Sequence, residues 1–314
     1  MIPRALTPAA FAGRGAGAVI ESFVGETMGT VWSLHAVAPP AGVIEGVQAA
    51  FNHVIGQMSQ WEPESDLSRF NRAPAGEWCV IPPEFASVVA AGQEIGRISH
   101  GAFSLAVGEL SEAWGFGASG PADTVSAIAA LKPGGIDFDP DSRRIRRHKG
   151  ALLDLSGIAK GYGVDLAADW LLAQSVRHFL LEVGGELRGE GIRPDGQPWW
   201  VDVELPPSWS GASWRLALHD LSVATSGDYR RGVEIDGKRY SHSFDPRSGR
   251  PIANGVRSVT VVHRSCMMAD GWATALTVLG AECGIALAEE QDIAACILAN
   301  GREHVSCAWR AMLD

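Results

Sequence analysis

The stretch from Asp154 to Asp165, D-L-S-G-I-A-K-G-Y-G-V-D, constrains the fold more than any other, because it predicts a strand, a tight turn and a helix in succession. The apolar residues 151–153 before it predict a short buried strand, and Ser156 and Gly157 form the turn. Apolar residues then recur every four positions, the spacing of one helix face: Ile158, Tyr162, Leu166 and Trp170.

The start of this helix has the chemistry of a phosphate site. Its first backbone N–H groups have no partner within the helix and carry a partial positive charge. Lys160 adds a full charge in the first turn, and Gly157 allows close approach, with a carbonyl that can face a metal ion. An ordinary strand–turn–helix with a serine cap and an exposed lysine has the same pattern. The stretch alone leaves both interpretations open.

Composition excludes some classes of function. The 314 residues can bury a large core, and 46% hydrophobic with 20% charged residues is typical of a soluble globular protein. The net charge is −10, and the one basic run, 143–149, is short and follows an Asp-Pro-Asp-Ser turn. Nucleic-acid binding needs a broad positive surface, so we predict no nucleic-acid partner and interpret this run as a solvated hairpin arm.

Cysteines and apolar runs indicate no further site or anchor. The five cysteines are scattered without a C-x-x-C pair, so neither a disulfide framework nor a zinc site is predicted. We find no run of about 18 apolar residues for a membrane span, no signal-peptide run, and no cysteine in residues 1–20 that could be lipidated. As written, the chain is expected to stay in the cytoplasm; a trimmed export segment is the alternative. We expect a loose tail over 1–20 and a single domain over 21–314.

The remaining elements interleave helices and short strands. Helical spacing predicts helices over 43–58, 65–71, 83–99, 119–131 and 268–279. Alternation predicts strands over 23–35 (interrupted at 27–30), 179–183, 199–205 and 214–218, a hairpin over 135–148, and a second hairpin joining 233–235 to 238–244. The connecting turns are short, so we predict an α+β fold with a mixed or antiparallel sheet.

Two features after the central helix have both a functional and a structural interpretation. Gly184 and Gly185 follow a buried strand, where they permit positive φ angles and close contact with a ligand, or simply form a turn. His242 shares one strand face with Tyr240 and Phe244. A histidine titrates near neutrality and suits base chemistry, but a packed, hydrogen-bonded histidine is the ordinary alternative.

Asp270 and Thr274 lie four residues apart on a predicted helix, so both side-chain oxygens share one face. A carboxylate and a hydroxyl suit a hard cation such as Mg²⁺, which shares phosphates of its substrate. Taken by itself, the pair is better explained by Asp270 capping the helix and Thr274 bonding back to its own helix.

Together these blocks resemble the ApbE-type flavin transferases, which move FMN from FAD onto a threonine or serine of a target protein. The matching segments follow the family's order from about residue 23 to 280: 28–30, 58–71, 101–116, 154–165, 183–185, 225–251 and 269–274. Each segment is a modest signal, but seven in order are specific. The resemblance implies an α+β fold with mixed or largely antiparallel sheets and packed helices, an ApbE-like architecture related to the T-fold.

The resemblance also implies roles for single residues. It makes His242 the base that deprotonates the acceptor hydroxyl, with Lys160 as a second catalytic residue. The Gly157 carbonyl, Asp270 and Thr274 would bind Mg²⁺. The FAD contacts would be Met28 against the flavin, Trp61 in the flavin pocket, Phe244 beside the cofactor, and Ser104, Leu105, Ala106, Asp154, Lys160, Asp165, Gly184, Gly185 and Ser226.

The implied reaction is Mg²⁺-dependent attack of the acceptor hydroxyl on the FMN-side phosphorus of FAD, with release of AMP. An Mg²⁺-dependent FAD pyrophosphatase and a non-catalytic FAD-binding protein are the alternatives. Ser104 and Ala106 stand where the family usually has Asp and Thr, which affects FAD affinity more than identity. Trp61 stands where Tyr or Asn can occur, a place that influences transfer against hydrolysis.

Overall fold

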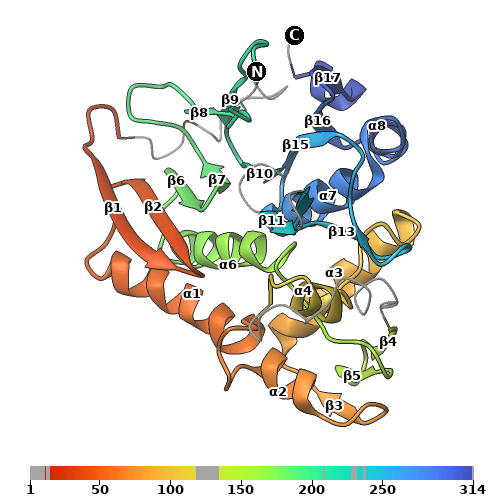
Figure 1. Cartoon of the computed structure of the whole chain (residues 1–314). Coiled ribbons are helices and arrows are strands. Elements are labelled where there is room, and N and C mark those ends of the chain that lie inside the picture. The colour runs from red at the N-terminus through yellow and green to blue at the C-terminus, as the bar shows by residue number, and fades with distance from the viewer. Residues whose placement is uncertain are drawn as a thin grey trace.

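The computed structural model describes residue 11 and residues 15–117, 134–207, 209–227, 232–235 and 238–312 (Figure 1). The predicted helix over 119–131 and most of the predicted tail over 1–20 lie outside the described residues. In the part of the chain that is described, no helix is long and apolar enough to cross a membrane.

One eight-stranded sheet forms the centre of the molecule (Figure 1). Every neighbouring pair of its strands is antiparallel, which confirms the predicted α+β class. In spatial order the strands are β1 (Ile20–Thr27), β2 (Thr30–Val37), β6 (Phe179–Val183), β7 (Glu186–Glu190), β10 (Leu221–Gly227), β15 (Val256–His263), β16 (Ala294–Ala299) and β17 (Arg302–Val305).

Helices cover one face of this sheet, where apolar side chains of the strands and helices form a common core. There α6 (Ala159–Ala173) packs between α1 (Val43–Met58) and α7 (Cys266–Leu279), and α3 (Pro83–Ile98) packs against α7. The shorter helices are α2 (Asp66–Arg72), α4 (Gly108–Ala113), α8 (Ala281–Glu290) and α9 (Cys307–Arg310). The opposite face carries a second apolar cluster, closed by the hairpin of β8 (Trp199–Asp202) and β9 (Arg215–Leu218).

Three small sheets complete the described fold. One has three strands, β3 (Trp78–Val80), β5 (Arg144–Arg147) and β4 (Ile136–Asp139), and contains the predicted hairpin over 135–148. The others pair β11 (Gly232–Ile235) with β12 (Lys238–Ser241) and β13 (Phe244–Asp245) with β14 (Arg250–Pro251). These two short pairs carry the chain through the region of His242.

Local signals predicted the helix boundaries well. The helix predicted over 43–58 has those bounds, and the one predicted over 83–99 ends one residue earlier. The helix predicted from 268 begins at Cys266, because the Ser265 hydroxyl caps it by accepting from the Met268 N–H. It ends before Gly280, whose φ of 84° closes the last turn.

Two predicted strands need correction. The interrupted strand over 23–35 is a hairpin, because Met28 and Gly29 adopt φ angles of 48° and 70° and turn β1 back onto β2. The strand predicted over 151–153 is wrong. The backbone of Leu153 is hydrogen-bonded by the Asn71 side chain rather than by a neighbouring strand. The amide group of Asn71 donates to the Leu153 carbonyl, and its oxygen accepts the Leu153 N–H.

A buried acid on β7 makes stability depend on pH. Burial raises the pKa of Glu190 to about 7, although Arg188, 2.8 Å away, acts in the opposite direction. The folded chain therefore binds this proton more tightly than the unfolded chain. Its contribution is full below about pH 4.3 and is lost as the pH rises through about 7. We expect the titration of Glu190 to lower the free energy of unfolding by about 1–3 kcal/mol as the pH rises from 5 to 8.

Urea unfolding of the parent and of Glu190→Gln at both pH values checks this expectation. The amide does not titrate, so the stability of the variant relative to the parent should increase with pH. Equal pH slopes in the two proteins would show that Glu190 titrates alike in the folded and unfolded chains.

Candidate functional site

Oxygen atoms from three elements converge at the start of α6. Gly157 lies just before that helix, and its carbonyl accepts a hydrogen bond from the Thr274 hydroxyl of α7 at 3.4 Å. The hydroxyl of Ser226, on β10, lies 3.3 Å from the same Thr274 oxygen. A Cβ added to Gly157 would lie 3.0 Å from that oxygen, so the glycine permits this approach. The structure thus brings together three of the residues predicted from the sequence.

Asp270 joins this corner from one turn earlier in α7. Its side chain is buried, and one carboxylate oxygen accepts the Gly161 N–H at 3.0 Å. Burial raises the pKa of this carboxyl, while Lys160 and the Gly161 N–H act against that rise. The alternative that Asp270 caps its own helix is wrong, because Ser265 is the cap. Thr274 likewise reaches across to Gly157.

These groups fit Mg²⁺ in chemical type, since a carboxylate, a hydroxyl and a carbonyl are hard oxygen ligands. Across the described residues there is no group of three or more His, Cys, Asp or Glu side chains that could hold a metal ion. A cation at the corner would therefore rest on one carboxylate, Asp270, and would need further oxygens from water or from a phosphate substrate.

Lys160 makes an ion pair that the sequence did not reveal. Its Nζ lies 2.5 Å from Oε2 of Glu186, and the side chains are 32% and 3% exposed. Glu186 opens β7 directly after Gly184 and Gly185, whose φ angles of 59° and 107° make the tight turn between β6 and β7. The two glycines therefore form a turn, one of the two roles that the sequence allowed, and this turn presents Glu186 to Lys160.

Asp154 links the corner to the segment predicted to lie along FAD. One of its oxygens accepts from the Ser111 hydroxyl of α4 at 2.6 Å, and the other accepts from the Ser156 N–H at 2.8 Å. Its own N–H donates to the Leu105 carbonyl at 2.8 Å. Because each side-chain oxygen accepts a hydrogen bond from a different element, the carboxylate is held in a fixed orientation beside the turn.

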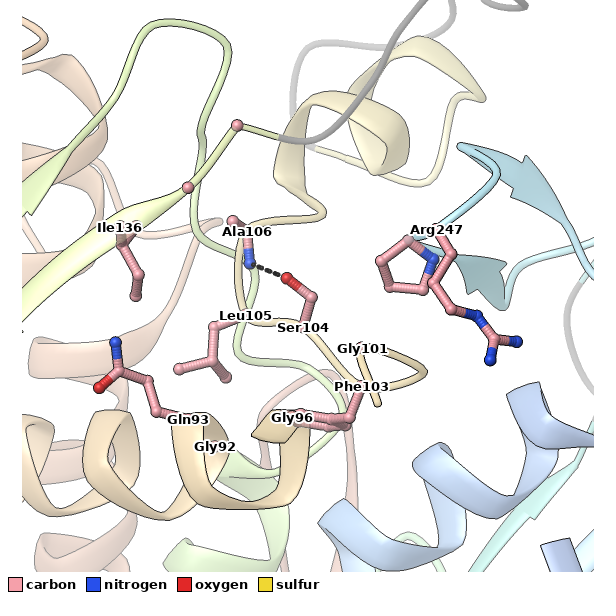
Figure 2. Close-up of a pocket in the computed structure, with 13 residues that line it drawn as sticks. Gly92, Gln93, Gly96, Gly101, Phe103, Ser104, Leu105, Ala106, Ile136 and Arg247 are labelled. Atoms are coloured by element: carbon pink, nitrogen blue, oxygen red, sulfur yellow. Dashed lines mark hydrogen bonds between the residues drawn. The ribbon is translucent and has the colours of Figure 1, made fainter. Parts of the chain in front are cut away.

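A pocket of about 360 Å³ opens beside that segment (Figure 2). The Ser104 hydroxyl accepts the Ala106 N–H at 3.1 Å within its wall, and Arg247 lies across the pocket from Gln93 and Ile136 (Figure 2). Pro246 also lines the pocket. Of the predicted residues, Ser104, Leu105 and Ala106 line the pocket, whereas Gly157, Asp270 and Thr274 are not among its lining. The other described residues of the wall are Gly92, Gln93, Gly96, Gly101, Phe103, Gly134, Gly135 and Ile136.

Aromatic rings surround His242, which follows β12. Its ring meets Phe116 edge-on, with 6.2 Å between ring centroids. Phe244 lies 6.0 Å from Phe116 and 6.5 Å from Trp114, and Tyr240 lies 5.0 Å from Trp114. As predicted, the residues at 240, 242 and 244 face a common surface, which Trp114 and Phe116 form just after α4. The strand predicted over 238–244 is divided, however, into β12 and β13. Helix α4 itself carries Ser111, the partner of Asp154.

The other residues predicted to contact FAD lie in three different environments. Met28, at the tip of the β1–β2 hairpin, packs on α6, where a Cβ on Gly163 would meet its terminal methyl at 2.7 Å. Trp61 is 61% exposed and therefore open to a ligand. Asp165 instead ties α6 to α7, accepting from the Ser265 hydroxyl and from the Cys266 and Met267 N–H groups at 2.7–3.0 Å. This contact accounts for Asp165 without any ligand.

The close approach of α6 and α7 makes Gly161 sensitive. A Cβ there would lie 2.3 Å from the Cys266 carbonyl oxygen and 2.8 Å from the Asp270 Cβ. We expect Gly161→Ala to lower the free energy of unfolding by about 2–3 kcal/mol and to displace Asp270, because a rigid backbone must give way. Gly56→Ala is the matched control. That helical glycine has nothing within 4 Å of the added Cβ, so the change should stabilise by about 0.5–1 kcal/mol.

Chemical denaturation of both variants measures these changes. An unchanged stability of Gly161→Ala would mean that the two helices can separate at little cost.

Known proteins resemble this chain over most of its length. Residues 28–298 match the ApbE family. An FAD:protein FMN transferase of Vibrio cholerae is 36% identical over 310 residues, covering 92% of each chain. One of Haemophilus influenzae is 31% identical over 294 residues, covering 88% of this chain and 85% of the relative. The apo crystal structure of the flavinyl transferase ApbE of Pseudomonas stutzeri superimposes with a TM-score of 0.85 at 37% identity, covering 94% and 97% of the two chains.

Proposed function

The chain belongs to the ApbE family and is an FAD:protein FMN transferase, and we propose that it works with Mg²⁺, bound by the Gly157 carbonyl, Asp270 and Thr274. The acceptor is the hydroxyl of a threonine or serine in a target protein. The observation that carries the proposal is the convergence of these oxygens at the start of α6, beside Lys160.

The chain's own residues supply binding and orientation. The ammonium of Lys160 and the N–H groups that open α6 attract the diphosphate of FAD. Met28, Trp61 and Phe244 offer apolar surface to the flavin. His242 takes the proton of the acceptor hydroxyl as that oxygen attacks the FMN-side phosphorus and AMP leaves.

When bound, Mg²⁺ supplies neutralisation of the charge on the diphosphate. Asp270 is suited to holding it, because its buried side chain supplies a carboxylate that the Gly161 N–H orients at 3.0 Å. The hydroxyl of Thr274 and the Gly157 carbonyl complete a set of three different oxygen types.

An assay with FAD, Mg²⁺ and a threonine-containing acceptor domain tests the proposal, with products followed by mass spectrometry. An acceptor that gains the mass of FMN while AMP is released, and only without chelator, supports it. Free FMN and AMP with an unlabelled acceptor would indicate water as the acceptor. Binding of FAD without turnover would exclude both reactions.

A further inference from the structure

The buried carboxylate of Glu186 has no role in the proposed reaction. Its side chain is 3% exposed, yet it opens a strand of the central sheet beside the proposed transfer site. A buried carboxylate is costly unless it is paired and hydrogen-bonded, and a buried ion pair is a weak source of stability. The position of Glu186 therefore calls for a reason other than stability.

The hairpin that carries Glu186 is rigid. Gly184 leaves no room for a larger residue, since a Cβ there would lie 2.8 Å from the Thr30 side chain. Glu186 pairs with Val183 across this turn, and β6 and β7 are both interior strands of the sheet. The carboxylate is thus presented from a fixed backbone.

In contrast to the fixed backbone of Glu186, the ammonium of Lys160 lies at the end of a flexible four-carbon side chain. The side chain is 32% exposed, so solvent still reaches it while its ammonium lies 2.5 Å from the Glu186 carboxylate. An ammonium has three N–H donors, which lets one bond to a carboxylate coexist with bonds to a ligand. The fixed carboxylate of Glu186 restricts the lysine side chain. It directs the remaining N–H donors of the ammonium toward the start of α6.

We propose that Glu186 is a positioning residue that fixes the ammonium of Lys160 at the start of α6 for the diphosphate of FAD. The inference rests on the proposed function, because that function makes Lys160 a diphosphate contact. Glu186 acts through Lys160 and touches neither FAD nor the acceptor. Its loss therefore matters only when the lysine is present.

A double-mutant cycle tests this dependence. FAD affinity, from fluorescence titration, and kcat/KM for FMN transfer are measured for the parent, Glu186→Gln, Lys160→Met and the double variant. We expect Glu186→Gln to weaken both quantities about tenfold or more, because a misplaced contact group costs binding and rate. In the Lys160→Met background the same change should alter either quantity by less than about twofold.

Glu190→Gln is the matched control. Glu190 lies on the same strand and is buried, but the cation with which it pairs is Arg188. Its conversion to glutamine should leave FAD affinity and kcat/KM within about twofold of the parent at a fixed pH.

Two results would overturn the proposal: parental affinity and turnover in Glu186→Gln, or an equal loss in both lysine backgrounds, which is the mark of a merely structural role. If Glu186→Gln fails to fold, Lys160→Met/Glu186→Met is compared with Lys160→Met, since an apolar pair removes both charges. If the parent binds FAD but transfers no FMN, the proposed function fails, while the affinity cycle still decides the role of Glu186.

Discussion

Replacing Asp270 with asparagine is expected to lower Mg²⁺-dependent transfer of FMN by about a hundredfold or more, with the fold retained. Asp270 is the only carboxylate in the proposed set of cation ligands, and a neutral amide binds Mg²⁺ far less strongly. The amide oxygen can still accept the Gly161 N–H, which the carboxylate accepts at 3.0 Å. Because burial already raises the pKa of Asp270, loss of the charge removes a desolvation cost.

Initial rates of FMN transfer across a series of Mg²⁺ concentrations, with circular dichroism as the check on folding, measure this effect. Thr274→Ser and Thr274→Val form a graded pair, because only serine keeps the hydroxyl that bonds the Gly157 carbonyl. Asp202→Asn is the control, since that exposed carboxylate pairs with Arg215 on the far hairpin. Full activity in Asp270→Asn would exclude this residue as a metal ligand.

Replacing His242 with glutamine is expected to lower kcat for transfer by about 10²- to 10⁴-fold, the usual contribution of a general base. The ring meets Phe116 at its edge and so has a defined orientation. Glutamine keeps polarity and similar reach but cannot accept a proton at neutral pH. The KM for FAD should change little, because the proposed contacts with FAD come from other residues.

Steady-state kinetics with the acceptor domain separate these two constants. His53→Gln is the matched control, because His53 lies half-exposed on α1, where it contacts Glu84 rather than the site. A kcat within a few-fold of the parent in His242→Gln would assign the proton transfer to another group. A large rise in KM alone would make His242 a binding residue.

Short-range signals were sufficient for much of the helical structure. The apolar period of α1 and the caps of α2 and α7 lie within a few residues of the boundaries they set, such as Ser65 and Ser265. The three proposed metal ligands could likewise be named from spacing and resemblance, and the structure brings two of them, Gly157 and Thr274, into contact.

Long-range pairing was not predictable in the same way. The segment 151–153 has the composition of a strand, but its partner is the side chain of Asn71, which no local pattern reveals. Periodicity did not separate the hairpin at Met28 from one interrupted strand, because the turn conformation decides between them. The strand β16 was not predicted, since its continuous apolar run, Ala294–Ala299, has no period.

Glu186 shows the same limit within the site. In the sequence it is one acidic residue after two glycines, a pattern common at solvent-exposed turns. Its significance comes from burial and from the approach of Lys160, which requires that a helix and a hairpin have already packed together. A charged residue directly after a Gly-Gly turn that ends a mostly apolar strand, Phe179–Val183, was the available signal.

The hydrogen bond from Thr274 to Gly157 joins residues 117 positions apart. During synthesis at about 5–20 residues per second, roughly 6–23 s separate the emergence of these two partners from the ribosome. Contacts this distant in sequence also slow folding, because the intervening chain must be ordered first. A nascent chain therefore gains its proposed transfer site only after Thr274 has left the ribosome, so a chain that stops before this residue lacks one of the proposed metal ligands.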